Sequence, residues 1–388
     1  MAEAVRDNAV WRERGRRWLT TAGSIVLALL VGAILMVVSD EEVIGQYAYL
    51  FTAPALPLGA TWAKVAGAYS ALALGALGSP LALASTAWQA APLIAAGLGV
   101  GLAFRAGLFN IGAQGQAVWG SIAAAYVGFA WPLPPVLHLI VAIAAGLLAG
   151  GVWGGIVGLL KARTGAHEVI VSIMMNFLAT ASLGWLLLTP MFLRPGRIDP
   201  IAPQIRDTAP FPILFGQLHV GFLVALAAAV LVWWLLDRST LGFAIRAVGS
   251  NAAAAGTAGM NVATVTMITM ALSGAFAGLG GVMYALGPGA NGVATPLSLG
   301  LVGSVGFDAL TVALLGRSRP VGIILAGLLF GGLHAGGLAM QSVAQTPLTL
   351  STVLQALIVL FVAAPAIVSA LLPKVRAPRR PALVGGEA

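Results

Sequence analysis

The stretch Phe104-Arg-Ala-Gly-Leu-Phe-Asn-Ile-Gly-Ala-Gln-Gly-Gln-Ala-Val-Trp-Gly120 separates two long apolar segments and decides how the chain is organised. It places one asparagine and two glutamines among four glycines (Gly107, Gly112, Gly115 and Gly120). Polar groups that lack water or a partner are costly inside a bilayer. Asn110, Gln114 and Gln116 are therefore predicted either to line a cavity or to join helices. The glycines either bend the backbone or allow a close neighbour.

The composition is that of a polytopic membrane protein. Of 388 residues, 59% are hydrophobic and 8% are charged, and the mean hydropathy is +0.97. A soluble domain carries about 25% charged residues. The absence of cysteine excludes disulfide, thiolate and cysteine–zinc chemistry. The chain is basic, but its arginines and lysines are scattered at the ends of apolar segments. This pattern favours a role in membrane topology over nucleic-acid binding.

About ten transmembrane helices are expected, since a span needs roughly 20 apolar residues. The stronger candidates cover residues 18–38, 86–104, 135–160, 169–189, 220–236, 265–286, 320–340 and 350–372. Two weaker candidates cover 117–131 and 298–316. Residues 60–83 are interpreted as a helix on the outer face or one that is partly inserted. The expected fold class is an all-α polytopic membrane protein.

The charge distribution predicts an orientation with both termini in the cytoplasm. All the basic residues fall on the inner side of such a topology except four: Lys64, Arg194, Arg197 and Arg206. The expected organisation is a basic cytoplasmic N-terminus (1–17), a transmembrane domain (18–372) and a cytoplasmic tail (373–388). Within the domain, the proline-rich loop 190–215 is expected to form a stiff extracytoplasmic cap.

The inner loop 237–262 is predicted to contain a short helix. Gly249-Ser-Asn251 offers a helix N-cap, and the alanines that follow are strong helix formers. Such a helix at the inner surface suits docking of a partner, although composition alone also allows an ordinary connecting turn.

Motifs for several enzyme classes are missing. A P-loop needs Gly-Lys-Ser/Thr, whereas the lysines Lys64, Lys161 and Lys374 follow alanine, leucine and proline. The chain has no His-Glu-x-x-His and no Gly-x-Ser-x-Gly motif. Its four histidines lie in separate segments: His138, His167, His219 and His334. We therefore expect no enzymatic activity and no metal site.

Two carboxylates, Glu168 and Asp308, fall in or beside predicted spans on the inner half and are candidate pathway residues. Glu168 has the alternative role of an acidic residue at a helix N-terminus. Asp308 has the alternative role of pairing with Arg317 or Arg105. Asn176 follows Glu168 by eight residues, so both can share one helix face.

The segment Gly303-Ser-Val-Gly-Phe-Asp308 is a counterpart of the stretch quoted first. Paired glycine-interrupted segments in two halves indicate a midplane site built on broken helices, so we expect two pseudo-repeated halves with re-entrant segments. Trp88, Gln89 and Phe307 are further candidates, with packing or interface anchoring as the alternative.

Four blocks of sequence are similar to the permease subunits of bacterial ABC importers, in the branch for nucleosides and simple sugars. They are GLFNIGAQGQ (107–116), GAHEVIVSIMMN (165–176), RAVGSN (246–251) and GFDALTVALLG (306–316), and they occur in the family's order. The similarity runs from about residue 18 to 372 and is greater to nucleoside permeases than to ribose-type ones. Gln114 stands where the family often has Glu, and His167 where it often has Asn. Both departures leave the particular substrate open.

The resemblance implies partners in the bacterial inner membrane. These are a second permease subunit, a cytoplasmic ATPase that uses the ATP, an extracytoplasmic binding (lipo)protein and the lipid bilayer; the chain itself binds no cofactor. Coupling to the ATPase is then expected at Arg246, Gly249, Ser250, Asn251, Ala254 and Gly259. The substrate pathway is expected at Asn110, Gln114, Gln116, Asn176, Phe307, Asp308, Trp88 and Gln89. Glu168, Gly107, Gly112 and Gly115 are expected to be structural or to lie in the pathway.

The expected function is import of a small polar solute by alternating access. The first candidate for this solute is a nucleoside, and the second is a simple sugar. Uncharged amides suit the hydroxyls and base edges of such a cargo. Two alternatives remain: an ion-coupled secondary transporter that uses Glu168 or Asp308, and a channel-like facilitator. The exact cargo and the composition of the permease pair stay open.

Overall fold

The computed structural model describes residues 23–289 and 291–363. The predicted cytoplasmic segments 1–17 and 373–388 lie outside the described residues. The chain divides into two compact units, one of residues 1–69 with 344–388 and the other of residues 70–343.

The smaller unit is built from helices joined at a sharp bend. The helix Gly23–Val38 bends by 75° into the segment Glu41–Tyr49, which holds α2 (Glu41–Gln46) and the 3₁₀ helix η1 (Tyr47–Tyr49). Asp40 lies at the bend: its carboxylate accepts from the Val43 amide and pairs with Lys64 Nζ at 2.6 Å. The unit also contains most of α3 (Ala55–Leu77) and the helix α14 (Leu348–Ala363).

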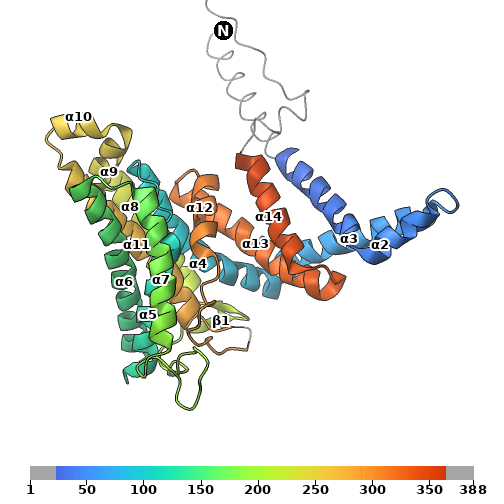
Figure 1. Cartoon of the computed structure of the whole chain (residues 1–388), viewed down its shortest axis with the longest axis horizontal. Coiled ribbons are helices and arrows are strands. Elements are labelled where there is room, and N and C mark those ends of the chain that lie inside the picture. Colours follow the sequence, from blue (N-terminus) through green and yellow to red (C-terminus); the bar gives the residue numbers. More distant parts are fainter. Residues whose placement is uncertain (1–22, 290, 364–388) are drawn as a thin grey trace, which may run out of the picture. The chain divides into compact units, whose positions relative to one another are not determined.

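The larger unit is organised around α11 (Val262–Leu286), which packs against α4 (Pro80–Arg105), α5 (Ala113–Ala130) and α6 (Pro135–Thr164) (Figure 1). Glycines let these helices approach closely. A Cβ placed on Gly120 would lie 2.3 Å from the Gly278 carbonyl oxygen, and one on Gly274 would lie 2.2 Å from that of Gly150. Small residues have this role where apolar side chains gain nothing by leaving lipid.

Further helices surround this core. α7 (Glu168–Leu187) packs on α5, and α8 (Gly221–Arg238) packs on α4. α12 (Val305–Leu315) packs on both α4 and α5. α13 (Pro320–Ala344) approaches α4 through glycine, since a Cβ on Gly331 would lie 2.5 Å from the Thr86 carbonyl oxygen.

Six described helices are long and apolar enough to cross a membrane: α4, α6, α7, α8, α11 and α13. The bent pair in the smaller unit raises this number to seven if it forms one span. The all-α membrane fold is thus confirmed, whereas the expected ten spans and the pseudo-repeat are not. α12 shows the reason, because 11 residues of helix are about 16 Å long and the hydrocarbon core is about 30 Å thick.

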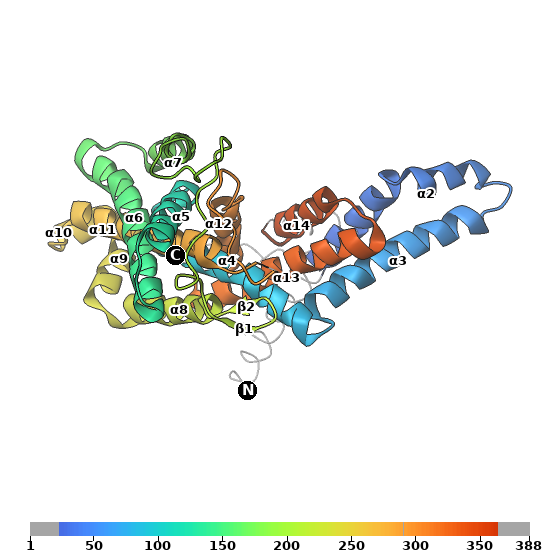
Figure 2. The same ribbon diagram turned by 90° about the horizontal axis from the view of Figure 1, so that it is seen from below.

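One sequence prediction needs correction. The predicted helix 60–83 is divided in the structure, because α3 ends at Leu77 and α4 begins at Pro80. Ser79 caps α4 by accepting from the Ala82 amide, and proline is favoured in a first helical turn. The fold also contains a small antiparallel hairpin of β1 (Ile213–Phe215) and β2 (Leu218–His219), located beside the start of α8 (Figure 2).

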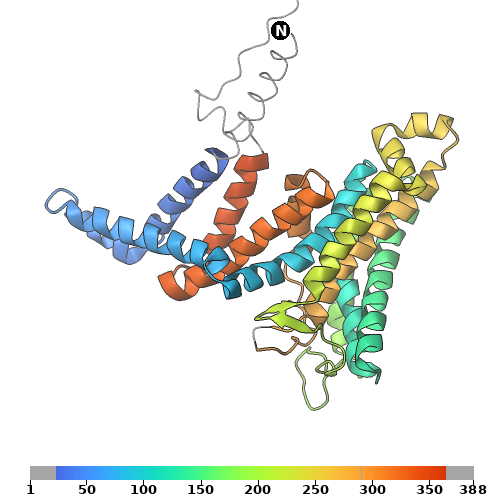
Figure 3. The same ribbon diagram turned by 180° about the vertical axis from the view of Figure 1, so that it is seen from behind.

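The proline-rich loop is ordered by backbone hydrogen bonds to one end of the core. Ala202 N donates to Leu297 O at 3.0 Å, and Phe211 N donates to Leu286 O at 3.0 Å. Arg206 N donates to Gly128 O at 2.9 Å. The hairpin lies at this same end, and the short helices α9 (Thr240–Ser250) and α10 (Ala252–Thr257) lie at the opposite end (Figures 1 and 3).

Candidate functional site

A cavity of about 360 Å³ lies at the hairpin end of the larger unit, between α4, α11 and the segment that follows α11. It brings together two residues that were predicted for the pathway, Trp88 and Gln89, which lie side by side on α4. Further polar side chains line it: His219, Tyr284, Thr295 and Ser298. The cavity therefore combines aromatic faces with uncharged hydrogen-bonding groups.

Pro92 leaves a backbone carbonyl of α4 free to accept a hydrogen bond beside the cavity. It lies inside α4 and lines the cavity four residues after Trp88. Proline has no N–H, so it cannot donate the helical hydrogen bond to the carbonyl of Trp88. That carbonyl is left without its usual helical donor beside the cavity, a feature that the sequence analysis did not identify.

His219 is a second cavity residue that the sequence analysis missed. The residue is 1% exposed, and its ring stacks on Phe211 with centroids 5.2 Å apart. Nδ1 accepts a hydrogen bond from the Gly221 amide at 3.0 Å, so the neutral ring carries its proton on Nε2. Burial lowers the pKa of His219 to about 4. The ring is therefore a neutral N–H donor at physiological pH.

Gly287 keeps the donor side of this ring open. A Cβ at Gly287 would lie 3.0 Å from His219 Nε2 and 2.2 Å from the Met283 carbonyl oxygen. The stacking of Phe211 on His219 across the hairpin is a tertiary contact with no local sequence motif, which explains why the histidine was not singled out.

Asn110 and Gln116 form a fully buried amide network. Asn110 Nδ2 donates to Gln116 Oε1 at 2.9 Å and to Ser273 Oγ on α11 at 2.8 Å. Asn110 Oδ1 accepts from the Gly112 amide at 2.9 Å and from Gln116 Nε2 at 3.2 Å. Both side chains are 0% exposed. These contacts join the turn before α5 to α11.

Gln114 and Asn176 also bind backbone groups of distant segments. Gln114 Nε2 donates to Gly303 O at 2.7 Å, and Gln114 Oε1 accepts from Gly306 N at 2.8 Å. Asn176 on α7 accepts from Gly115 N at 2.8 Å and donates to Ile111 O at 2.9 Å. The amide side chains thus hold the stretch 107–116 against α7, α11 and the turn before α12.

The three glycines of this stretch have separate structural roles. Gly107 has φ +70°, a left-handed conformation that favours glycine. A Cβ on Gly112 would lie 3.0 Å from Ser172 Cβ, and one on Gly115 would lie 3.0 Å from the Met175 carbonyl oxygen. Gly107 therefore bends the backbone, whereas Gly112 and Gly115 allow close neighbours.

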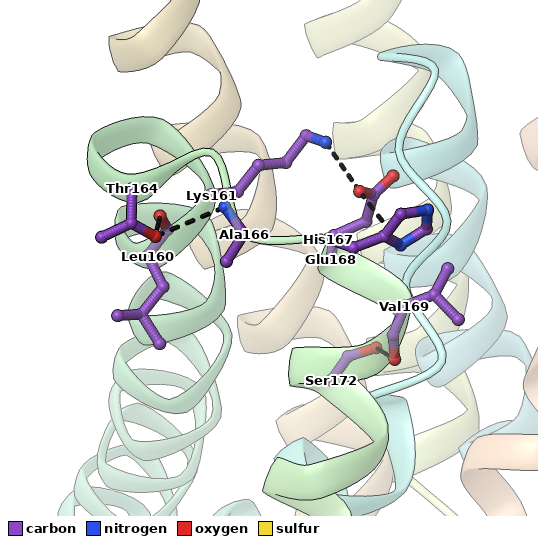
Figure 4. Close-up of polar contacts among 8 residues, drawn as sticks. All are labelled: Leu160, Lys161, Thr164, Ala166, His167, Glu168, Val169 and Ser172. Atoms are coloured by element: carbon purple, nitrogen blue, oxygen red, sulfur yellow. Dashed lines mark hydrogen bonds and ion pairs between the residues drawn. The ribbon is translucent and has the colours of Figure 1, made fainter.

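Glu168 is held by an ion pair at the start of α7. Lys161 Nζ, at the end of α6, lies 2.6 Å from Glu168 Oε2 (Figure 4). His167 Nδ1 lies 3.9 Å from the same oxygen. In the part of the chain that the structure describes, no group of three His, Asp or Glu side chains could hold a metal ion.

Asp308 has a different partner from the arginine considered in the sequence analysis. Ser304 Oγ donates to Asp308 Oδ2 at 2.8 Å, and no ion pair of Asp308 with arginine occurs among the described residues. Arg105 instead donates from Nε to the Ser318 carbonyl at 3.0 Å. The neighbouring Phe307 is 51% exposed and does not line the cavity.

The predicted short helix after Asn251 is present as α10. Asn251 Oδ1 accepts from the Ala254 amide at 3.0 Å and so caps this helix, and Gly259 beyond it has φ +86°. Gly249 packs on the end of α4, since a Cβ there would lie 2.1 Å from the Arg105 carbonyl oxygen. Arg246 lies 3.8 Å from Asp237, and Ser250 is exposed.

Comparison with known proteins gives consistent matches. Residues 82–363 match the family described as branched-chain amino acid transport system, permease component. The guanosine ABC transporter permease NupP of Bacillus subtilis is 39% identical over 350 residues, which is 88% of this chain and 91% of that protein. The glucose ABC transporter permease TsgB13 of Haloferax volcanii is 36% identical, over 89% of this chain and 87% of its own.

A third relative covers slightly more of the sequence. The nucleoside ABC transporter permease NupB of Lactococcus lactis is 32% identical over 373 residues, which is 93% of this chain and 95% of that protein. No solved structure matches the chain.

Proposed function

Since the chain belongs to the family of permease components of branched-chain amino acid transport systems, we propose that its cargo is a nucleoside or, second, a simple sugar. The chain is the multi-pass membrane component of an ABC transporter. It is not itself a catalyst and binds no cofactor, since ATP is used by a separate subunit. The preference for a nucleoside rests on the guanosine and nucleoside permeases among its relatives.

The observation that carries the proposal is the cavity beside Trp88. Its volume of about 360 Å³ lies at the lower end of the range of small-molecule sites, which runs from about 300 to 1,000 Å³. A nucleobase has a flat π face that stacks on an aromatic ring, and this contact is worth about 1–3 kcal/mol. Trp88 and Tyr284 offer such faces.

The polar groups of the cavity match the rest of a nucleoside. Gln89 both donates and accepts, His219 donates from Nε2, and the Trp88 carbonyl accepts. Ribose hydroxyls and base edges need this mixture of uncharged donors and acceptors. A carboxylate in the same place would favour a cation.

The four amides of the sequence analysis take a supporting role in this proposal. Asn110, Gln114, Gln116 and Asn176 hold the walls of the pathway through the hydrogen bonds described above. Gln114 joins the two glycine-interrupted segments directly, which supports the hypothesis that they are paired broken helices. Phe307 and Asp308 lie beside this joint and form the surface that a second permease completes.

The transport mechanism proposed is alternating access between two permeases. The ten crossings of this proposal count the six long spans, the bent helix pair of the smaller unit as one span, and partial spans at α5, α12 and α14. Both termini face the cytoplasm of a bacterial inner membrane.

Three partners complete the proposed transporter. The second permease is a different chain, a cytoplasmic ATPase docks on the 237–262 loop, and an extracytoplasmic binding protein supplies the cargo. Arg246, Gly249, Ser250, Asn251, Ala254 and Gly259 shape the docking loop.

The ion-coupled and channel alternatives have less support. An ABC permease draws its energy from an ATPase, so the membrane carboxylates need not bind a coupling ion. Glu168 in particular is already neutralised by Lys161 at 2.6 Å.

ATP-dependent uptake of radiolabelled guanosine into vesicles that contain the whole transporter tests this proposal. Trp88→Ala and Gln89→Ala should each raise KM about tenfold, because each removes one contact worth about 1.4 kcal/mol. Trp185→Ala is the matched control, because this tryptophan is 68% exposed on α7 and lies outside the cavity.

Competition with unlabelled solutes identifies the cargo class. Adenosine and uridine should compete with guanosine, and ribose or glucose at the same concentration should not. Competition by glucose alone would favour the sugar hypothesis, and uptake driven by a proton gradient without ATP would reject an ABC mechanism.

A further inference from the structure

A second cavity, of about 500 Å³, lies at the α9 end of the larger unit and carries positive charge. Three arginines line it from separate elements: Arg105 ends α4, Arg246 lies in α9 and Arg319 precedes α13. Asp237 is the one acidic residue of its lining, so three positive charges and one negative charge leave a net charge of +2. The transport proposal places two of its lining residues, Asp237 and Arg246, in the loop that docks the ATPase, but it assigns the cavity itself no ligand.

Arg246 presents an unsatisfied charged donor. Its Nη1 atom is buried and has no hydrogen-bond partner among the described residues. Asp237 Oδ1 lies 3.8 Å away, beyond hydrogen-bond distance. The Arg246 side chain as a whole is 39% exposed and pairs loosely with Asp237, but a buried donor atom without a hydrogen bond usually has a ligand, an ion or water beside it.

The turn that presents Arg319 is strained. Arg317 and Ser318 have φ of 53° and 51°, a left-handed conformation that is uncommon outside glycine. The Ser318 carbonyl accepts from Arg105 Nε at 3.0 Å, which holds the Arg105 side chain against the turn before Arg319. Strained backbone of this kind persists where its surroundings hold it, and it concentrates at ligand sites.

The remaining wall of the cavity is apolar and belongs to candidate spans. Trp233 on α8 is 44% exposed, and Val321 on α13 is 67% exposed. A free inorganic anion would use the arginines and leave this surface uncovered. An amphiphile with an anionic head would cover both parts.

We propose that this cavity binds an anionic phospholipid, with the phosphate between Arg105, Arg246 and Arg319 and an acyl chain along Trp233 and Val321. Arginine recognises phosphate oxygens through paired N–H groups, and basic pockets between membrane helices suit lipid head groups. The proposed topology places α9 on the cytoplasmic side, so the site lies in the inner leaflet. This lipid-binding proposal rests on the membrane location of the chain and is independent of the identity of the cargo.

Native mass spectrometry of the whole purified transporter, exchanged into phosphatidylglycerol or phosphatidylcholine, tests the proposal. We expect phosphatidylglycerol to be retained about tenfold better, and the variant Arg105→Gln/Arg319→Gln to lose this preference. Arg238→Gln is the matched control, because this exposed arginine ends α8 at the same end of the unit and does not line the cavity.

A second variant keeps the test decisive if the double variant does not assemble. Val321→Asp retains all three arginines and should also weaken phosphatidylglycerol retention, because it places a carboxylate on the apolar surface that the acyl chain covers. Equal retention of the two lipids would overturn the proposal. Displacement of the lipid by millimolar inorganic phosphate would assign the cavity to a free anion instead. Loss of the ATPase from the arginine variants with unchanged lipid retention would assign it to subunit contact.

Discussion

At the residue scale, the neutral His219 makes stability depend on pH. Its folded-state pKa of about 4 lies below the unfolded value of 6.5, so the unfolded chain binds more protons between these values. The contribution is therefore present above pH 6.5 and is lost as the pH falls toward 4. At pH 5 the loss is about 2 kcal/mol. We expect the melting temperature of the purified transporter to fall between pH 7.5 and pH 5.

A variant that lacks only the His219 imidazole isolates this effect. His219→Asn keeps an acceptor for the Gly221 amide and removes the titration, so its melting temperature should fall less over the same range. His167→Asn is the control, because it also removes one histidine and this side chain is 66% exposed. Equal pH dependence in the wild type and the His219 variant would contradict the assignment.

The buried amides give a second residue-scale prediction. Asn110→Ala leaves Gln116, Ser273 and the Gly112 amide without partners in a site that water does not reach. Each such group costs about 1–3 kcal/mol, so the variant should melt several degrees lower and assemble poorly. Gln89→Ala should instead raise KM with little change in melting temperature. A higher KM at unchanged stability in the Asn110 variant would place its amide on the substrate.

The residue types of this site were predictable, whereas their partners were not. The presence of Asn110, Gln114 and Gln116 among glycines predicted either a cavity or helix joining, and the sequence could not separate the two. The decision depends on Ser273 and Gly303, which are more than 150 residues away along the chain. His219 was missed because Phe211 and Gly287, which define its surroundings, come together with it only in the folded chain.

At the element scale, α10 is the segment whose coupling role can be tested most directly. Asn251→Leu removes the side chain that caps this helix and should cost about 1 kcal/mol of local helix stability. If the helix transmits movement to an ATPase, nucleotide hydrolysis in the assembled complex should continue while ATP-driven uptake falls. Both rates are measured in the same proteoliposomes.

Asn251→Ser provides the matched control, because serine also caps helices and should preserve coupling. Gly259→Val provides an independent test of the same helix, since φ +86° is unfavourable for valine. Full coupling in both Asn251→Leu and Gly259→Val would exclude the proposed role of α10.

Element boundaries show which local signals were sufficient. The N-cap at Asn251 was visible in sequence, because a cap depends on the few residues around it. The break between α3 and α4 depends on Ser79 and Pro80, which are equally local, but the apolar character on both sides of them obscured it. The length of α12 was overestimated because hydropathy does not report where a chain turns back.

At the scale of the whole molecule, the proposed orientation of the spans rests on the charge distribution and can be tested on the native background. The chain has no cysteine, so each single-cysteine variant carries a unique label site. Ile198 in the proline-rich loop is 96% exposed, and Ser250 before α10 is exposed. The charge bias predicts that a membrane-impermeant maleimide labels Ile198→Cys in intact spheroplasts and Ser250→Cys only in inside-out vesicles. Labelling of both from one side would reject the topology, because the two positions lie at opposite ends of the bundle and an odd number of crossings must separate them.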